Sequence, residues 1–126
     1  MNSFETKKLP ENRDAVAPDG FDVKILLTLT KGGLAYFELA PNMISKAGSH
    51  HSIEEIWYFL KGQGEMWRKL NDYEEIVRVE PGTCITIPTG THFQVRSIGA
   101  EPLSAIGVTM PPWPGPDEWY AVKGKW

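Results

Sequence analysis

The chain has 126 residues, of which 41% are hydrophobic, and carries a formal net charge of −3. This length suits one domain, with a core that removes about two thirds of the unfolded surface from water. The basic residues are dispersed rather than gathered into a stripe, and no apolar run approaches the roughly 18 residues of a membrane span, so neither nucleic acid nor membrane is an expected partner.

Short strands joined by tight turns are predicted along the whole chain. Its 12 glycines and 10 prolines lie scattered between β-rich runs, and no segment has a convincing helical pattern. A polar arm, residues 1–20, precedes a β domain over residues 21–110. Within that domain we expect strands at residues 21–30, 34–40, 55–60, 65–70, 73–79, 83–87, 92–98 and 103–110.

The last part of the chain, residues 111–126, opens with the sequence PPWPGP. Proline has no backbone N–H to donate to a sheet, so we expect an extended strap here with Trp113 as its anchor. At the other end, the first twenty residues lack the hydrophobic stretch of a signal peptide, which favours a cytoplasmic location. Cys84, the single cysteine, has no partner for an internal disulfide, and its alternating apolar strand predicts a packed thiol.

Two histidine-containing segments carry the best indication of chemistry. They read KAGSHHSIEEIWYFLKGQG and PGTCITIPTGTHFQ. A divalent transition metal binds neutral imidazole nitrogens and carboxylate oxygens, held from different strands so that one side stays open. His51, Glu55 and His92 supply such a set. On one straight strand His51 and Glu55 would lie roughly 13 Å apart, so residues 52–54 must form a turn between two strands.

With these residues in view, the chain resembles a single-domain member of the cupin superfamily. The first cupin motif, G-x5-H-x-H-x3 or 4-E-x6-G, is matched from His51 through Glu55 to Gly62. The second, G-x5-P-x-G-x2-H-x3-N, is matched less closely, with one residue fewer before the histidine and no asparagine; its matching positions are Gly82, Pro88, Gly90 and His92. The resemblance implies an all-β cupin barrel, that is, a double-stranded β-helix or jelly roll, with an N-terminal arm and a proline-rich C-terminal strap.

One usual ligand of the family is missing, because Ser49 stands where the first motif has its first histidine. His50 is adjacent, but on a regular strand it would point to the opposite face from His51. A bulge would bring His50 inward beside His51, or shift the pairing to His50 with Glu54. The sequence does not choose between these arrangements, nor among Fe, Mn, Ni and Zn as the bound metal.

Four further residues are candidates for binding a substrate. Trp57 and Phe59 share a face with Glu55 by alternation, and Gln94 and Arg96 share a face with His92, which predicts a polar inner face beside the metal. Conceivable proton-transfer groups, in contrast, are spread over the chain: Tyr36, Glu38, His50 and Tyr58. No catalytic residue is assigned.

The sequence thus leaves two functions open. One is a metal-dependent enzyme, of isomerase, lyase or dioxygenase type, that acts on a small polar substrate such as a sugar derivative or an oxo-acid. The other is a small-molecule sensor or carrier that has kept only part of the metal site. Residues 56–60, IWYFL, are apolar on both faces of their strand, so we also expect a covering partner, most simply a second copy in a homodimer.

Overall fold

The computed structural model describes residues 4–126 and contains eleven strands and one short 3₁₀ helix. In chain order these are β1 (Ala15–Val16), β2 (Asp22–Thr28), β3 (Gly33–Leu39), β4 (Gly48–His50), β5 (Glu54–Lys61), β6 (Gln63–Leu70), β7 (Tyr73–Val79), β8 (Cys84–Ile87), β9 (His92–Ile98), β10 (Leu103–Met110), η1 (Pro116–Glu118) and β11 (Trp119–Ala121). The predicted strands at 73–79, 92–98 and 103–110 agree with β7, β9 and β10 at both ends.

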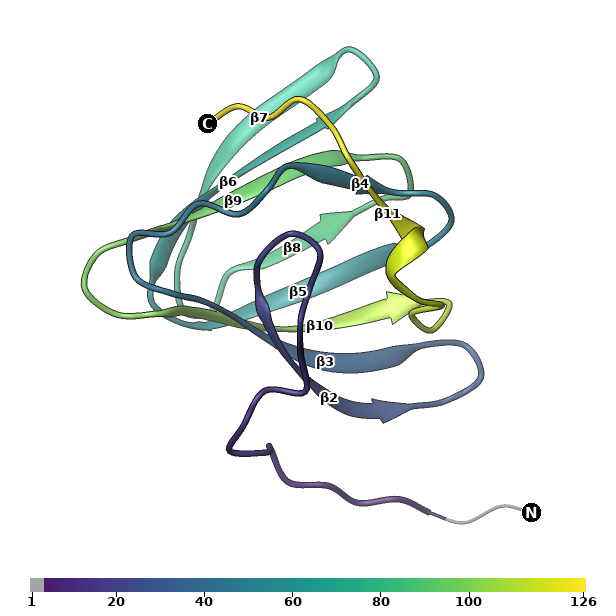
Figure 1. The fold of residues 1–126 in the computed structure, drawn as a ribbon. Helices are drawn as coiled ribbons and strands as arrows, with labels where there is room; N and C mark the ends of the chain where they lie inside the picture. Colours follow the sequence, from purple (N-terminus) through teal and green to yellow (C-terminus); the bar gives the residue numbers. More distant parts are fainter. Residues whose placement is uncertain (1–3) are drawn as a thin grey trace.

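Two antiparallel sheets form the body of the molecule, which confirms the all-β class (Figure 1). The first sheet has the strand order β1-β2-β3-β10-β5-β8, and the second has the order β11-β4-β9-β6-β7. Each sheet mixes strands from the two halves of the chain, so the two histidine segments are distributed over both sheets: β5 and β8 lie in the first, β4 and β9 in the second.

The core lies between the sheets and is rich in aromatic rings. Strand β5 shows how it forms, because Trp57 and Phe59 point inward and are 2% and 0% exposed, whereas the alternate side chains Ile56 and Tyr58 are 41% and 45% exposed. The apolar run therefore splits into a core face and an outward apolar face. The core cluster consists of Phe21, Leu39, Trp57, Phe59, Met66, Val79, Ile85, Ile87, Phe93, Val95, Leu103 and Ala105.

Strand β8 departs from one expectation. Its inward residues are Ile85 and Ile87, and alternation turns Cys84 outward, so the thiol is exposed rather than packed. β8 is also an edge strand of the first sheet, paired with β5 among the described residues.

Local geometry fixes the turn between β5 and β6 at Gly62. Its φ of +84° is unfavourable for residues with a side chain, and a Cβ there would lie 2.4 Å from the carbonyl oxygen of Pro102. Glycine is therefore required for the close approach of this turn to the start of β10. The turn leads the chain from β5 in the first sheet to β6 in the second.

Both terminal segments contribute an edge strand. β1 pairs with β2, and β11 pairs with β4, placing Trp119 opposite His50. The proline-rich residues 111–116 form no β-strand, as expected. Beyond Pro116 every residue again has a backbone N–H to donate, so β11 can pair with β4. The boundaries at 20/21 and 110/111 stay predictions.

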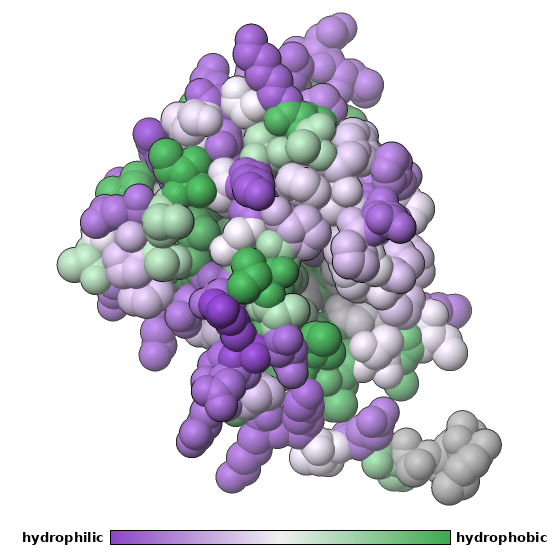
Figure 2. Space-filling model, in the orientation of Figure 1, coloured by the Kyte–Doolittle hydropathy of each residue, from purple (hydrophilic) through white to green (hydrophobic). Residues whose placement is uncertain are grey.

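Figure 2 shows that apolar groups on the viewed face stand in small patches among hydrophilic ones.

Candidate functional site

His50 and Glu55 form the centre of the candidate site. β4 ends at His50 and β5 begins at Glu54, so the bend at residues 51–53 turns both side chains into the space between the sheets. They are 5% and 4% exposed, and the Nε2 atom of His50 lies 2.7 Å from Oε2 of Glu55. The approach lacks the alignment of a hydrogen bond, and neither ring nitrogen has a hydrogen-bond partner among residues 4–126.

Trp57 fixes the other oxygen of this carboxylate. Its Nε1 donates a 3.0 Å hydrogen bond to Oε1 of Glu55, a contact that follows from the shared face of residues two apart on β5. The indole is packed against Phe21 and stacked on Phe37, with ring centroids 5.6 Å and 5.0 Å away. Trp57 and Phe59 therefore belong to the core cluster, and Trp57 also orients the carboxylate.

Phe93, and not His92, points toward this pair from β9. Phe93 is 1% exposed and its ring centroid lies 5.4 Å from that of His50. His92 is half-buried on the opposite face, in register with Lys69 of β6. Counted from Gly90, the cupin motif has its histidine at position 93; this chain has Phe93 at that inward position, and His92, one residue earlier, falls on the other face by alternation. The inner face at this strand is accordingly Phe93 and Val95, in place of the polar face expected from His92.

His51 also lies away from Glu55. It is the first residue beyond β4, it is exposed, and its ring lies over Tyr120 of β11 at 4.4 Å between centroids. Of the two arrangements considered for the histidine pair, neither is present: His50 meets Glu55, and His51 faces the strap. The end of the strand at His50 is what separates the two neighbouring side chains.

The residues present do not fit a resident transition metal. Catalytic centres of this chemistry use three protein ligands and keep one position open. In residues 4–126 no three His, Cys, Asp or Glu side chains are arranged to hold an ion. Two donors, His50 and Glu55, are brought together, and the ring of Phe93 faces them where a third donor would be needed.

A third ionisable group, Asp19, acts on the same pair. It is 7% exposed and its Oδ1 accepts a 3.3 Å hydrogen bond from the backbone N–H of Phe21. The pKa of Asp19 is raised to about 6, chiefly by burial and also by the charge of Glu55, although the Phe21 hydrogen bond and His50 act to lower it. No sequence pattern indicates this role, because Pro18-Asp19-Gly20 has the composition of an ordinary turn.

The C-terminal strap covers His50. The ring of Trp113 meets the His50 ring edge to face, with centroids 5.6 Å apart. Farther along, the carboxylate of Glu118 accepts hydrogen bonds from the N–H of Ser52 at 2.6 Å, the hydroxyl of Ser52 at 2.6 Å and the N–H of Ile53 at 3.1 Å. Glu118 thereby fixes the bend that turns His50 and Glu55 inward. No local pattern in the sequence indicates such a contact, since 66 positions separate Glu118 from Ser52.

Gln94 and Arg96 bind the tail of the chain on the outer side of the second sheet. The Oε1 atom of Gln94 accepts hydrogen bonds from the N–H groups of Lys125 and Trp126 at 2.9 Å and 3.0 Å. Arg96 donates to Glu65 at 2.9 Å and lies over the Trp126 ring. The structure does not bring either residue to His50 and Glu55.

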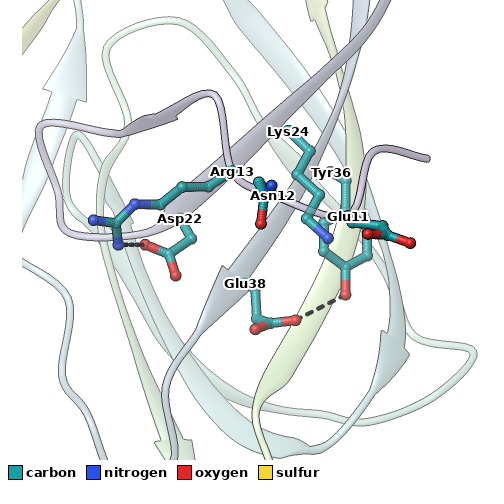
Figure 3. Close-up of a pocket in the computed structure, with 7 residues that line it drawn as sticks. All are labelled: Glu11, Asn12, Arg13, Asp22, Lys24, Tyr36 and Glu38. Carbon is teal, nitrogen blue, oxygen red and sulfur yellow. Dashed lines mark hydrogen bonds and ion pairs between the residues drawn. The ribbon is translucent and has the colours of Figure 1, made fainter.

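The remaining proton-transfer candidates lie on the outer face of the first sheet. The hydroxyl of Tyr36 donates a 3.0 Å hydrogen bond to Glu38, beside Lys24 and beneath the N-terminal arm. Together with residues of the arm they line a polar surface pocket of about 190 Å³ (Figure 3). Tyr58 is exposed on the same outer face. Of the four candidates, His50 is the one within the space between the sheets.

Comparison with known proteins agrees with this architecture. A curated relative, the uncharacterized protein MJ1618 of Methanocaldococcus jannaschii, is 34% identical over 64 residues, which are 51% of this chain and 48% of that protein. The match thus spans about half of the relative's length.

No helix within residues 4–126 has both the length and the apolar character needed to span a membrane.

Solved structures with low sequence identity share the fold. An uncharacterized conserved protein with a double-stranded β-helix domain from Klebsiella pneumoniae superposes with a TM-score of 0.68 at 14% identity, over 82% of this chain and 80% of that one. Oxalate decarboxylase of Bacillus subtilis, a protein with Mn(II) centres, gives a TM-score of 0.73 at 16% identity, over 89% of this chain and 30% of that one.

The sequence itself matches a family model. The model described as the cupin domain aligns with residues 35–109, more than half of the chain. This stretch runs from β3 to the end of β10 and contains both histidine segments. The chain therefore belongs to the cupin domain family, and its barrel is the double-stranded β-helix that the motif resemblance implied.

Proposed function

We propose that this protein is a small-molecule-binding cupin that acts as a sensor or carrier, with a metal site reduced to His50 and Glu55. The observation that carries the proposal is the inward ring of Phe93, 5.4 Å from His50, in the place that a third donor would take. A hydrocarbon ring binds no metal, and two donors leave the set incomplete.

The enclosure of His50 supports the same function. The rings of Phe93 and Trp113 pack against it from β9 and from the strap. Glu55, the group beside it, is already engaged by Trp57. A catalytic base needs a path to the proton that it removes, and these contacts close the approach to His50 while the strap is in place. A protein that binds a small molecule elsewhere in the barrel without converting it requires no accessible base.

A metal-dependent enzyme is the second candidate function. Its supporting observation is that Nδ1 of the buried His50 lacks a hydrogen-bond partner among residues 4–126 and that Nε2 has only the close approach of the Glu55 carboxylate, an arrangement compatible with a ligand for Fe, Mn, Ni or Zn. The Mn(II) centres of the structurally similar oxalate decarboxylase point the same way. Such an enzyme would act on a small polar substrate by isomerisation, elimination or dioxygenation.

Elemental analysis combined with a ligand screen separates the two functions. Untagged protein is analysed for Fe, Mn, Ni and Zn, and a library of small polar compounds is tested by thermal shift before and after treatment with EDTA. The proposal expects a metal content well below one ion per chain, and stabilisation by a compound that persists after chelation. Stoichiometric metal with product formation abolished by EDTA would establish the enzyme instead.

We also propose a homodimer through the outward apolar face of the first sheet. Ile56, Tyr58 and Leu60 on β5 are 41%, 45% and 37% exposed, and the outward side of the neighbouring β10 adds Ile106 and Val108, which are half-buried. An apolar patch on a sheet is a common surface for a twofold contact with an identical chain.

A cytoplasmic location is also proposed. The exposed free thiol of Cys84 supports it, because free thiols persist in a reducing compartment.

A further inference from the structure

A second pocket lies where the edge strands of the two sheets, β7 and β8, approach each other. Strands β6 and β7 of the second sheet provide one wall, and β8 with the turn that follows it provides the other; the lining residues used below are Arg68, Leu70, Tyr73, Glu75, Pro88 and Thr91. The pocket has a volume of about 290 Å³. This is near the lower end of ligand sites in proteins, roughly 300 Å³, and suits a single small molecule.

A chain of three polar side chains runs along one wall. The Nη2 atom of Arg68 donates to Oε2 of Glu75 at 2.6 Å, and the hydroxyl of Tyr73 donates to Oε1 of the same carboxylate at 2.8 Å. Nη1 of Arg68 donates to the carbonyl oxygen of Thr86 at 2.7 Å, which fixes the guanidinium across the two sheets. The wall thus presents donors and acceptors whose formal charges cancel.

Two buried polar atoms of this pocket remain without a partner. Thr91 is 2% exposed, and its hydroxyl has no hydrogen-bond partner among residues 4–126. The Nε atom of Arg68 is likewise buried and unpartnered within the described chain. Buried polar groups in native proteins are nearly always hydrogen-bonded, so two unpartnered ones in the lining of a single pocket point to a ligand that completes them.

The other surfaces of the pocket are apolar. Leu70 and Pro88 line it from opposite walls, and Tyr73, 68% exposed, offers a ring as a platform at its rim. A ligand here therefore meets polar groups on one side and hydrocarbon on the other. An exposed aromatic ring beside paired charged groups is suited to a molecule with hydroxyls around its edge and C–H bonds on its face.

We propose that this pocket binds a small uncharged polyhydroxylated molecule of the size of one sugar ring or one cyclitol. Hydroxyl groups both donate and accept, so they can bond to Glu75, to Arg68 and to Thr91 at once. A charged ligand would bring a charge that the neutral Arg68–Glu75 pair does not balance. The inference rests on the proposed function, since it places and specifies the small molecule that the barrel binds.

The pocket adjoins the candidate site through Phe93. Phe93 stands opposite Arg68 in the pairing of β6 with β9, and its ring contacts His50. The residue that replaces the third metal donor thus also lies next to the pocket. Ligand binding in this cupin is therefore offset from the remnant of its metal site, toward β6 and β7.

An NMR titration of the full chain tests the proposal. ¹⁵N-labelled protein is titrated with D-glucose, D-xylose and myo-inositol as neutral probes, and with acetate, pyruvate and benzoate as anionic probes of similar or smaller size. We expect saturable shifts for at least one neutral probe, largest at the amides of Leu70, Tyr73 and Thr91. Shifts produced by the carboxylates alone would overturn the assigned ligand class.

Thr91→Val provides the decisive variant, because it removes the hydroxyl and keeps the shape. Loss of the Thr91 hydroxyl is expected to weaken the binding of the neutral probe about tenfold. The unfolding midpoint should not fall, since the hydroxyl has no partner to lose within the described chain. Ser97→Ala, which removes another buried and unpartnered hydroxyl from the same strand region, is the matched control and should leave affinity unchanged.

A second pair of variants changes Tyr73, an exposed residue whose substitution should not disturb the core. Tyr73→Ala removes the exposed ring and should weaken binding about five- to tenfold, whereas Tyr73→Phe keeps the ring and should restore most of the affinity. Equal affinity in wild type, Thr91→Val and Tyr73→Ala would overturn the proposal. So would the absence of saturable shifts for all three neutral probes.

The outcomes also separate this inference from the proposed function. Shifts that centre on His50 and Glu55 and persist with EDTA would refute the pocket and leave the metal-independent binding protein standing. Shifts that disappear with EDTA, accompanied by turnover of the probe, would refute the proposed function itself.

Discussion

The ring of Phe93 faces the ring of His50 with 5.4 Å between centroids, in the space where a metal-binding cupin would need another donor. Phe93 stands at the position, three residues after Gly90, where the cupin motif has its histidine. His92, the residue before it, lies on the opposite face by alternation. The chain therefore belongs to the cupin family, but the inner face of its barrel lacks the third donor that a metal ion would need.

Restoring the third donor should create a metal site. In the variant Phe93→His we expect binding to rise to about one Zn²⁺ or Co²⁺ per chain after dialysis against the metal, because an imidazole would then join His50 and Glu55 on the inner face. Metal content is measured by inductively coupled plasma mass spectrometry. The control is His92→Ala, which should have the metal content of the wild type; a loss of metal in this control would instead assign His92 as a ligand.

Ionisation of Asp19 should make the protein less stable as the pH rises. The pKa of Asp19 is about 6 in the folded protein against an ordinary value of 3.8. The folded state therefore binds the proton more tightly, and the free energy of unfolding should fall between pH 4 and pH 6 and stay lower above that range. In Asp19→Asn this loss should be absent, leaving the variant more stable than the wild type at pH 7.5 by up to about 3 kcal/mol.

Urea unfolding followed by tryptophan fluorescence at several pH values measures this effect. Asp72→Asn, at an exposed turn position, is the matched control and should follow the wild-type curve. If the Asp19→Asn and wild-type curves ran parallel from pH 4 to pH 6.5, the buried carboxyl would not be the group responsible.

Glu118 should hold the strap to the bend after β4. Burial alone would raise the pKa of Glu118, but the hydrogen bonds from Ser52 and Ile53 lower it below its ordinary 4.5. A lowered pKa means that the ionised form stabilises the fold above about pH 4.5 and that this contribution is lost as the pH falls through the folded value. Glu118→Gln should therefore cost about 1–3 kcal/mol at pH 7 and less at pH 4.

Amide hydrogen exchange supplies the local readout for this variant. The N–H groups of Ser52 and Ile53 should exchange faster in Glu118→Gln, while amides in β6 and β7 keep their rates. Glu54→Gln, an exposed carboxylate immediately after the bend, is the control and should leave the strap in place. Unchanged exchange at Ser52 would contradict the contact.

Charged substitutions on the outer face of β5 should prevent dimer formation. We expect wild type to sediment as a dimer, and Ile56→Lys with Tyr58→Glu to sediment as a monomer, because each places a charge in the apolar contact. Both side chains are partly exposed within the single chain, so the fold itself should tolerate the change. Leu29→Glu, at an 81% exposed loop position, is the control for a general effect of added charge. A wild type that sediments as a monomer would refute the dimer.

The sequence alone determined the fold and most of its strands. Alternating apolar residues and turn signals predicted β7, β9 and β10 at both ends, because side-chain alternation and glycine or proline breaks are local properties of the chain. The spacing from His51 to Glu55 also predicted a bend between two strands correctly. The resemblance to cupins rested on these same local features, and the family model confirms it.

Only the tertiary structure decided which side chains meet in the site. The choice of His50 over His51 follows from where β4 ends, and the choice of Phe93 over His92 follows from the register in which β9 pairs with its neighbours. Asp19 and Glu118 reach the site from segments far away in the sequence, through contacts that no local pattern encodes. Strand formation is local, but the convergence of side chains from separate strands depends on register and on long-range packing.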